Sequence, residues 1–111
     1  MSPKEMIEGL YEAFARGDVP TVLGAMHPEI LWHEAESNPY RPSGEAWVGP
    51  EAVLNNLFVK LAEEWEGFSV HPESFLEDGN QVVMQGRYGG IYRSTGRSLD
   101  VQACHVWTLA D

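Results

Sequence analysis

The dominant hydrophobic period of this sequence changes from helical to alternating after about residue 67. Before that point apolar side chains recur at helical spacing, as Ile7, Leu10 and Phe14 do. Beyond it they alternate, most clearly over residues 99–109. A chain that is first helical and then extended is expected to place its helices on one face of an antiparallel sheet, which is an α+β architecture.

Helix start and stop signals divide the chain further. Ser2 and Pro3 are typical of a helix N-terminus, and Gly17 with Asp18 ends that helix. The expected order is two helices, a strand, a helix and three strands, over residues 3–16, 19–26, 30–36, 50–64, 68–77, 81–92 and 99–109. Residues 38–49 contain two prolines and two glycines, which predicts a functional loop or flap.

Size and charge limit the function classes. With 111 residues, 43% of them hydrophobic, the chain is expected to form one domain over residues 1–111. Its formal charge of −10, from 7 basic and 17 acidic residues, disfavours nucleic acid and anionic membranes as partners. A single cysteine and the lack of a signal-like N-terminus favour a cytoplasmic protein.

Four short strings, in this order, resemble the SnoaL-like, ketosteroid-isomerase-related branch of the nuclear-transport-factor-2-like superfamily. They are Tyr11-Glu12-Ala13-Phe14 with Arg16-Gly17-Asp18, Trp32-His33-Glu34, Val48-Gly49-Pro50-Glu51-Ala52-Val53, and His105-Val106-Trp107-Thr108-Leu109. The resemblance implies a cone-shaped, curved antiparallel sheet wrapped around three helices, with a conical cavity inside. It also implies a homodimer through the outer sheet face, but it does not fix an activity, because members differ in function.

The resemblance has one large departure at the C-terminus. In the family a turn and a final strand follow the Trp-Thr strand, whereas this chain stops at Asp111. We therefore expect a C-terminally truncated domain, and a partner chain that supplies the missing edge is the alternative.

Two polar residues are candidates for catalysis. The resemblance places Glu34 where the isomerases keep a carboxylate that shuttles a proton next to a carbonyl, with Trp32 beside it as apolar wall. It places His105 where they keep a protonated acid that donates to the developing oxyanion. The alternatives are that Glu34 lies in water at a strand end, as Glu36 would, and that His105 is a hydrogen-bonded structural group.

The isomerase phenol is expected to be lost. The first-helix tyrosine of those enzymes aligns with Leu10, and Tyr11 is displaced from it by about 100° around a helix. Strict ketosteroid isomerase activity is therefore not expected, and Tyr88 is either a substitute donor or a wall residue. The residues expected to line the cavity are Tyr11, Phe14, Trp32, Tyr40, Trp47, Phe58, Met84, Tyr88 and Trp107.

The remaining candidates carry less chemistry. The histidines lack metal-ligand spacing, so neither a metal nor another cofactor is expected. Cys104 lies on the opposite strand face and is expected to be a small buried or interface hydrophobe. Two main hypotheses follow: an isomerase- or cyclase-like enzyme acting on an apolar carbonyl compound, or a non-catalytic domain that binds a small apolar ligand. A dimeric scaffold is a third, with less support.

Overall fold

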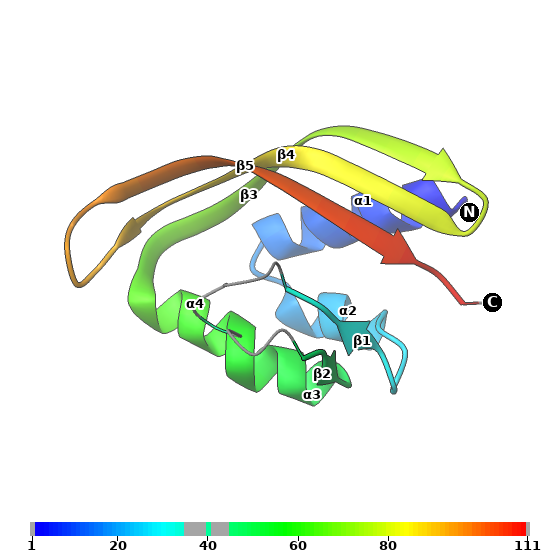
Figure 1. The fold of residues 1–111 in the computed structure, drawn as a ribbon, viewed down its shortest axis with the longest axis horizontal. Helices are drawn as coiled ribbons and strands as arrows, with labels where there is room; N and C mark the ends of the chain where they lie inside the picture. The colour runs from blue at the N-terminus through cyan, green and yellow to red at the C-terminus, as the bar shows by residue number, and fades with distance from the viewer. Residues whose placement is uncertain (1, 35–39, 41–44, 111) are drawn as a thin grey trace.

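The computed structural model describes residues 2–34, 40 and 45–110 (Figure 1). In chain order its elements are α1 (Pro3–Ala15), α2 (Val19–Gly24), β1 (Leu31–Trp32), β2 (Trp47–Val48), α3 (Pro50–Val53), η1 (Leu54–Phe58), α4 (Val59–Glu64), β3 (Trp65–Asp78), β4 (Gln81–Tyr92) and β5 (Ser98–Thr108). Strands β3, β4 and β5 form an antiparallel sheet in that order, and β1 pairs with β2. The sheet arches over helices that lie on one side of it (Figure 1), which confirms the predicted α+β class.

The first two helices begin at side-chain caps. The Ser2 hydroxyl accepts a hydrogen bond from the Glu5 backbone at 3.1 Å, and the Glu5 carboxylate accepts one from the Ser2 backbone at 3.3 Å. The Asp18 carboxylate accepts bonds from the Thr21 hydroxyl at 2.7 Å and its backbone at 3.3 Å, and these bonds lower the pKa of Asp18. Each cap is worth about 1 kcal/mol. Together they fix where α1 and α2 start below the sheet.

The third helix contains a wide turn that its sequence period did not indicate. Elements α3, η1 and α4 follow one another without a break over the predicted range 50–64. Within η1 the bonding is of the π type, since the Val59 backbone donates to the Leu54 carbonyl five residues earlier. Such turns are uncommon and recur at functional sites. Val53 and Leu57, on the predicted apolar stripe, are buried.

The sheet register brings one face of each strand to the helices. Met84 on β4 pairs with Phe75 on β3 and with His105 on β5. The Tyr11 ring of α1 packs on both flanking rings, with centroids 5.7 Å from Phe75 and 5.9 Å from His105. Helix α1 therefore lies across this row, and Met84 between the two rings is 0% exposed.

Strand β3 bends where Pro72 interrupts it. The β3–β4 register shifts between Pro72 and Ser74, and Gly86 on β4 is the partner of Pro72. A Cβ atom on Gly86 would lie 2.2 Å from the carbonyl oxygen of His71, so only glycine fits this crossing. The bulge and the glycine together allow the strong curvature of the sheet.

Of the strand predicted over residues 30–36, the structure describes residues 30–34. Within these, only Leu31 and Trp32 pair, with Val48 and Trp47 of β2. The Ile30 carbonyl accepts from the Gly49 backbone at 2.8 Å, which extends the contact by one bond. Within the loop or flap predicted over residues 38–49, Trp47 and Val48 form strand β2. Residues 38, 39 and 41–44 of this range lie outside the described part of the chain.

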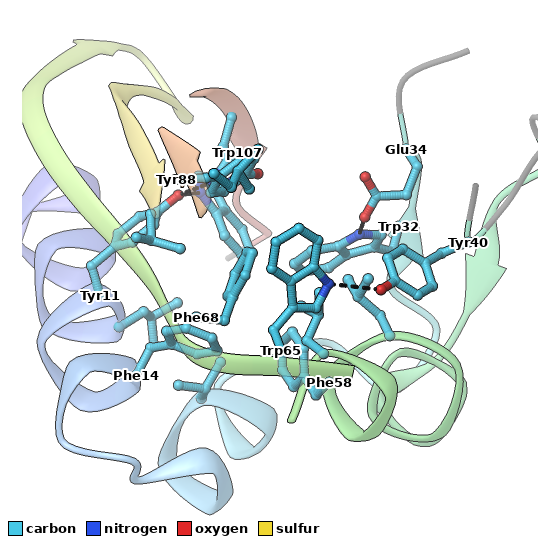
Figure 2. A pocket seen from close by; sticks show the side chains of 17 residues that line it. Tyr11, Phe14, Trp32, Glu34, Tyr40, Phe58, Trp65, Phe68, Tyr88 and Trp107 are labelled. Carbon is cyan, nitrogen blue, oxygen red and sulfur yellow. Dashed lines mark hydrogen bonds between the residues drawn. The ribbon is translucent and has the colours of Figure 1, made fainter. Parts of the chain in front are cut away.

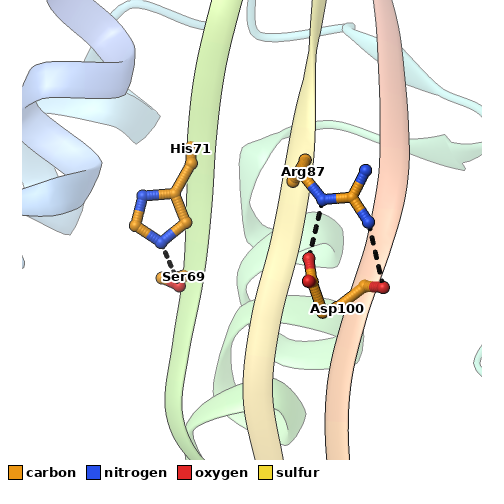
Figure 3. Close-up of polar contacts among 4 residues, drawn as sticks. All are labelled: Ser69, His71, Arg87 and Asp100. Carbon is orange, nitrogen blue, oxygen red and sulfur yellow. Dashed lines mark hydrogen bonds and ion pairs between the residues drawn. The ribbon is translucent and has the colours of Figure 1, made fainter.

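The outer face of the sheet, turned away from the helices, carries polar side chains such as Arg87 and His71 (Figure 3). It also carries a row of apolar residues that pair across the three strands, namely Leu76, Val83 and Val106. There Arg87 donates to the Asp100 carboxylate at 2.7 Å, and Ser69 and His71 share a hydrogen bond at 3.0 Å. Cys104 lies exposed on this face, which corrects the expectation of a buried position within the chain. Among the described residues, no helix is long and apolar enough to cross a membrane.

Candidate functional site

A cavity of about 340 Å³ lies between the inner sheet face and the helices (Figure 2). Most of its described lining is aliphatic or aromatic, and the charged side chain within that lining is Glu34. Its walls come from α1, from the third helix, from Trp32 and Glu34 at β1, and from the three long strands. This volume suits one small, mostly apolar molecule.

Seven of the nine predicted wall residues line this cavity: Tyr11, Phe14, Trp32, Tyr40, Phe58, Tyr88 and Trp107. Trp47 and Met84 do not. Trp47 is 4% exposed and packs in the core with Ala13 and Val53, because the β1–β2 pairing turns it toward the helices. Met84 is covered by α1, as described above. Face alternation predicts the side of a strand, but not whether a helix already covers that position.

Several wall residues were missed by sequence reasoning. Trp65, Phe68, Val70 and Leu99 line the cavity from the strands. Strand β3 begins at Trp65, directly after α4. The alternating pattern predicts this strand only from residue 68, so its predicted start is three residues late. The aromatic side chains of Trp65 and Phe68 are the signal that could have located the true start.

Glu34 reaches the cavity beside Trp32. The Trp32 indole N–H donates to Glu34 Oε1 at 2.8 Å, as two residues of one extended segment with the same facing can do. The Trp32 ring in turn packs edge-on against Trp107, with centroids 5.6 Å apart. Glu34 is half-buried, so its carboxylate stands at the cavity wall rather than at a fully exposed strand end.

His105 lies between two phenols on the opposite part of the wall. Its Nδ1 is 2.5 Å from the Tyr11 hydroxyl, and its Nε2 shares a short hydrogen bond with the Tyr88 hydroxyl. The Trp107 indole N–H donates to the Tyr11 oxygen at 2.8 Å. We call these four residues, Tyr11, His105, Tyr88 and Trp107, the phenol–imidazole chain. They come from α1, β4 and β5.

Burial sets the protonation of the phenol–imidazole chain. It lowers the pKa of His105 to about 4, so the imidazole is neutral near pH 7. Burial, with the Glu34 charge as a smaller cause, raises the pKa of Tyr88 to about 12. Burial also raises the pKa of Tyr11. The site therefore holds neutral hydrogen-bond donors opposite one carboxylate.

The expected loss of a first-helix phenol is not what the structure shows. Leu10 and Tyr11 both line the cavity, so one position of displacement on α1 does not turn Tyr11 away. The long tyrosine side chain reaches β5, where its hydroxyl meets His105. A phenol from α1 is thus present in the cavity, in a different arrangement from the one that the alignment with Leu10 led us to expect.

Tyr40 is held at the cavity by two polar contacts. Its hydroxyl donates to Glu64 Oε1 at 2.8 Å and accepts from the Trp65 indole at 2.9 Å. Burial and the Glu64 carboxylate raise the pKa of Tyr40. Within residues 2–34, 40 and 45–110, no three His, Cys, Asp or Glu side chains are grouped so that they could hold a metal ion.

The described residues thus form an α+β fold in which a curved sheet encloses an apolar cavity over helices, with a few polar groups on the wall. The family model of the SnoaL-like domain matches residues 7–111, and the chain belongs to this family. The predicted resemblance is therefore confirmed. A search of curated proteins found no match.

Solved structures share this fold closely. An NTF2-like protein from Burkholderia thailandensis is 28% identical, with a TM-score of 0.91 over 99% of this chain and 82% of its own. An NTF2-like protein of unknown function from Burkholderia pseudomallei is also 28% identical, with a TM-score of 0.84 over 100% and 84% of the two chains. TerC, co-crystallised with polyporic acid, is 25% identical, with a TM-score of 0.82 over 99% and 84%.

Proposed function

We propose that this protein is an isomerase- or cyclase-like enzyme that transfers a proton on an apolar carbonyl compound, without a metal. One observation carries the proposal: a carboxylate, Glu34, and the neutral phenol–imidazole chain share one apolar cavity. Membership of the SnoaL-like family and the co-crystal of TerC with polyporic acid support a small-molecule role.

The chemistry needs both groups. Glu34 would take a proton from the carbon next to the carbonyl, and the electron pair left behind would move onto the carbonyl oxygen. The phenol–imidazole chain would donate a hydrogen bond to that oxygen as it becomes negative. With an unsaturated ketone, protonated Glu34 would then return the proton to the far carbon of the conjugated enolate as the carbonyl re-forms, which completes an isomerisation. With a poly-β-carbonyl compound, the enolate carbon would instead attack the carbon of a second carbonyl, and the alkoxide formed there would take the proton from Glu34, which closes a ring.

The cavity wall favours neutral substrates. Among the described residues its one charged side chain is acidic, and the whole chain carries a formal charge of −10. An anionic ligand would meet repulsion from both. An apolar ketone or a poly-β-carbonyl compound would instead contact apolar walls, and its oxygen would accept a hydrogen bond from the phenol–imidazole chain.

The test is turnover by the Glu34→Gln variant. The purified protein is assayed on a panel of apolar unsaturated ketones and aromatic poly-β-carbonyl compounds. Loss of a general base lowers kcat by about 10²- to 10⁴-fold. Glu63→Gln is the matched control, since Glu63 is exposed on α4, does not line the cavity, and its substitution removes the same charge. Equal turnover by wild type and Glu34→Gln would remove the mechanism.

A non-catalytic binding domain is the second candidate. The polar groups of the phenol–imidazole chain already bond to one another, as they would in a wall built to hold a ligand rather than to transform it. Native mass spectrometry of the protein with the same panel separates the two functions. Stable, unchanged complexes without turnover favour the binding domain.

A further inference from the structure

Both ring nitrogens of His105 already have a phenol partner. Nδ1 faces Tyr11 and Nε2 faces Tyr88. A neutral imidazole carries one N–H and one lone-pair nitrogen. One of the two phenols must therefore donate to His105, while the other accepts from it. His105 has no third polar atom to offer a ligand.

Trp107 fixes the direction of this chain. An indole N–H can only donate, so the Tyr11 oxygen is an acceptor at 2.8 Å. The Tyr11 O–H is then free to donate to His105 Nδ1. In the reverse order two N–H donors, from Trp107 and His105, would converge on the Tyr11 oxygen. The Tyr11 O–H, instead of the Tyr88 O–H, would then be the hydroxyl left without an acceptor in the described part of the chain, and the bonds would no longer run in one direction.

The order that starts at Trp107 and ends at Tyr88 is also favoured by cooperativity between its hydrogen bonds. Each group that accepts a bond becomes a better donor to the next, so bonds aligned in one direction polarise one another. With Nδ1 as acceptor, the proton of His105 resides on Nε2 and is donated to the Tyr88 oxygen. The Tyr88 O–H is then the one hydroxyl of the phenol–imidazole chain that does not donate a hydrogen bond to another of its members.

We propose that Tyr88 is the residue that donates to the ligand oxygen and that His105 is a positioning residue, held as its Nε2–H tautomer by Trp107 and Tyr11. This inference rests on the proposed function and specifies which atom of the site meets the carbonyl. The raised pKa of Tyr88 keeps its proton in place, and the lowered pKa of His105 keeps the imidazole neutral. Glu34 and Tyr88 both line the cavity of about 340 Å³, so base and donor face the same small substrate.

The tautomer is tested on the unmodified protein without ligand. Long-range proton–nitrogen correlation NMR distinguishes a protonated ring nitrogen from a lone-pair nitrogen, and comparison with His105→Gln assigns the signal among the four histidines. The proposal expects the proton on Nε2 and a lone pair on Nδ1. The opposite pattern, or a doubly protonated ring near neutral pH, overturns it.

Ligand contact is tested with para-nitrophenol, whose absorbance reports binding and ionisation and whose oxygen resembles an enolate. The measurements use the Glu34→Gln background to remove charge repulsion. Tyr88→Phe should weaken binding about 10- to 100-fold, as expected for loss of a bond to a charged acceptor. Tyr11→Phe, the matched phenol in the same chain, should weaken it only a few-fold. An equal or larger loss in Tyr11→Phe overturns the proposal.

The tests of the donor order and the tests of the proposed function can fail independently of each other. The expected tautomer without any Glu34-dependent turnover would refute the proton-transfer function and leave the donor order intact. The opposite tautomer with Glu34-dependent turnover would refute the donor order alone. If para-nitrophenol does not bind, the NMR measurement still decides the donor order.

Discussion

Replacement of His105 by glutamine should change how the stability of this protein depends on pH. Glutamine keeps one donor and one acceptor for the two phenols but cannot take up a proton in this range. In the unfolded chain a histidine has a pKa of 6.5, whereas burial lowers the folded value for His105 to about 4. A difference of about 2.5 between these pKa values corresponds to about 3 kcal/mol.

The sign follows from proton uptake. Between pH 6.5 and about 4 the unfolded chain binds a proton at His105 and the folded chain does not. The unfolding free energy therefore falls as the pH falls through this window, and it is fully retained above about pH 6.5. Wild type should lose about 3 kcal/mol more than His105→Gln between about pH 7 and pH 4.

Urea unfolding, followed by tryptophan fluorescence at a series of pH values, measures this difference. Other groups titrate in both proteins, so subtracting one curve from the other isolates His105. Parallel curves for wild type and variant would refute the burial of a neutral imidazole between Tyr11 and Tyr88. The refutation would hold even if the variant is less stable at every pH.

Two further predictions concern the scaffold around the cavity. Gly86→Ala should cost about 1–3 kcal/mol of unfolding free energy, because the new methyl would meet the His71 carbonyl at 2.2 Å, whereas Gly9→Ala, with nothing within 4 Å in α1, should stabilise by up to about 1 kcal/mol. Met84→Ala, at a 0% exposed position, should cost about 2–5 kcal/mol, and Val106→Ala, at 64% exposure, should stay within about 0.5 kcal/mol. Thermal or urea unfolding measures all four, and equal effects within either pair would contradict the packing described.

The sequence predicted what depends on local spacing. The change of hydrophobic period identified helices before strands, and strand alternation put Trp32 with Glu34 and His105 with Trp107. These relations hold because residues i and i+2 of a strand place their side chains on the same face of the sheet, and this does not depend on the rest of the fold. The cap at Ser2 is similarly local, and α1 starts where expected. Asp18, predicted only as part of the stop of the first helix, also caps α2.

Relations between distant segments could not be predicted in the same way. Tyr11 and His105 are 94 residues apart, and their bond depends on where α1 crosses the sheet. The same crossing buries Met84, which face alternation alone had put on the cavity wall. The hydrophobic period does not distinguish the π turn in η1 from a regular helical turn, and it does not locate the start of β3 at Trp65 to within a few residues. Differences of this size are smaller than hydrophobic periodicity can resolve.

Hydrogen exchange at the substrate carbon tests the central claim most directly. An apolar unsaturated ketone is incubated with the protein in deuterium oxide, and deuterium at the carbon next to the carbonyl is followed by NMR. We predict exchange well above the buffer rate for wild type and for Glu63→Gln, and a loss of about 10²-fold or more for Glu34→Gln. Exchange at the buffer rate with every ketone that binds, or exchange unchanged in Glu34→Gln, would contradict a proton transfer by Glu34 in this cavity.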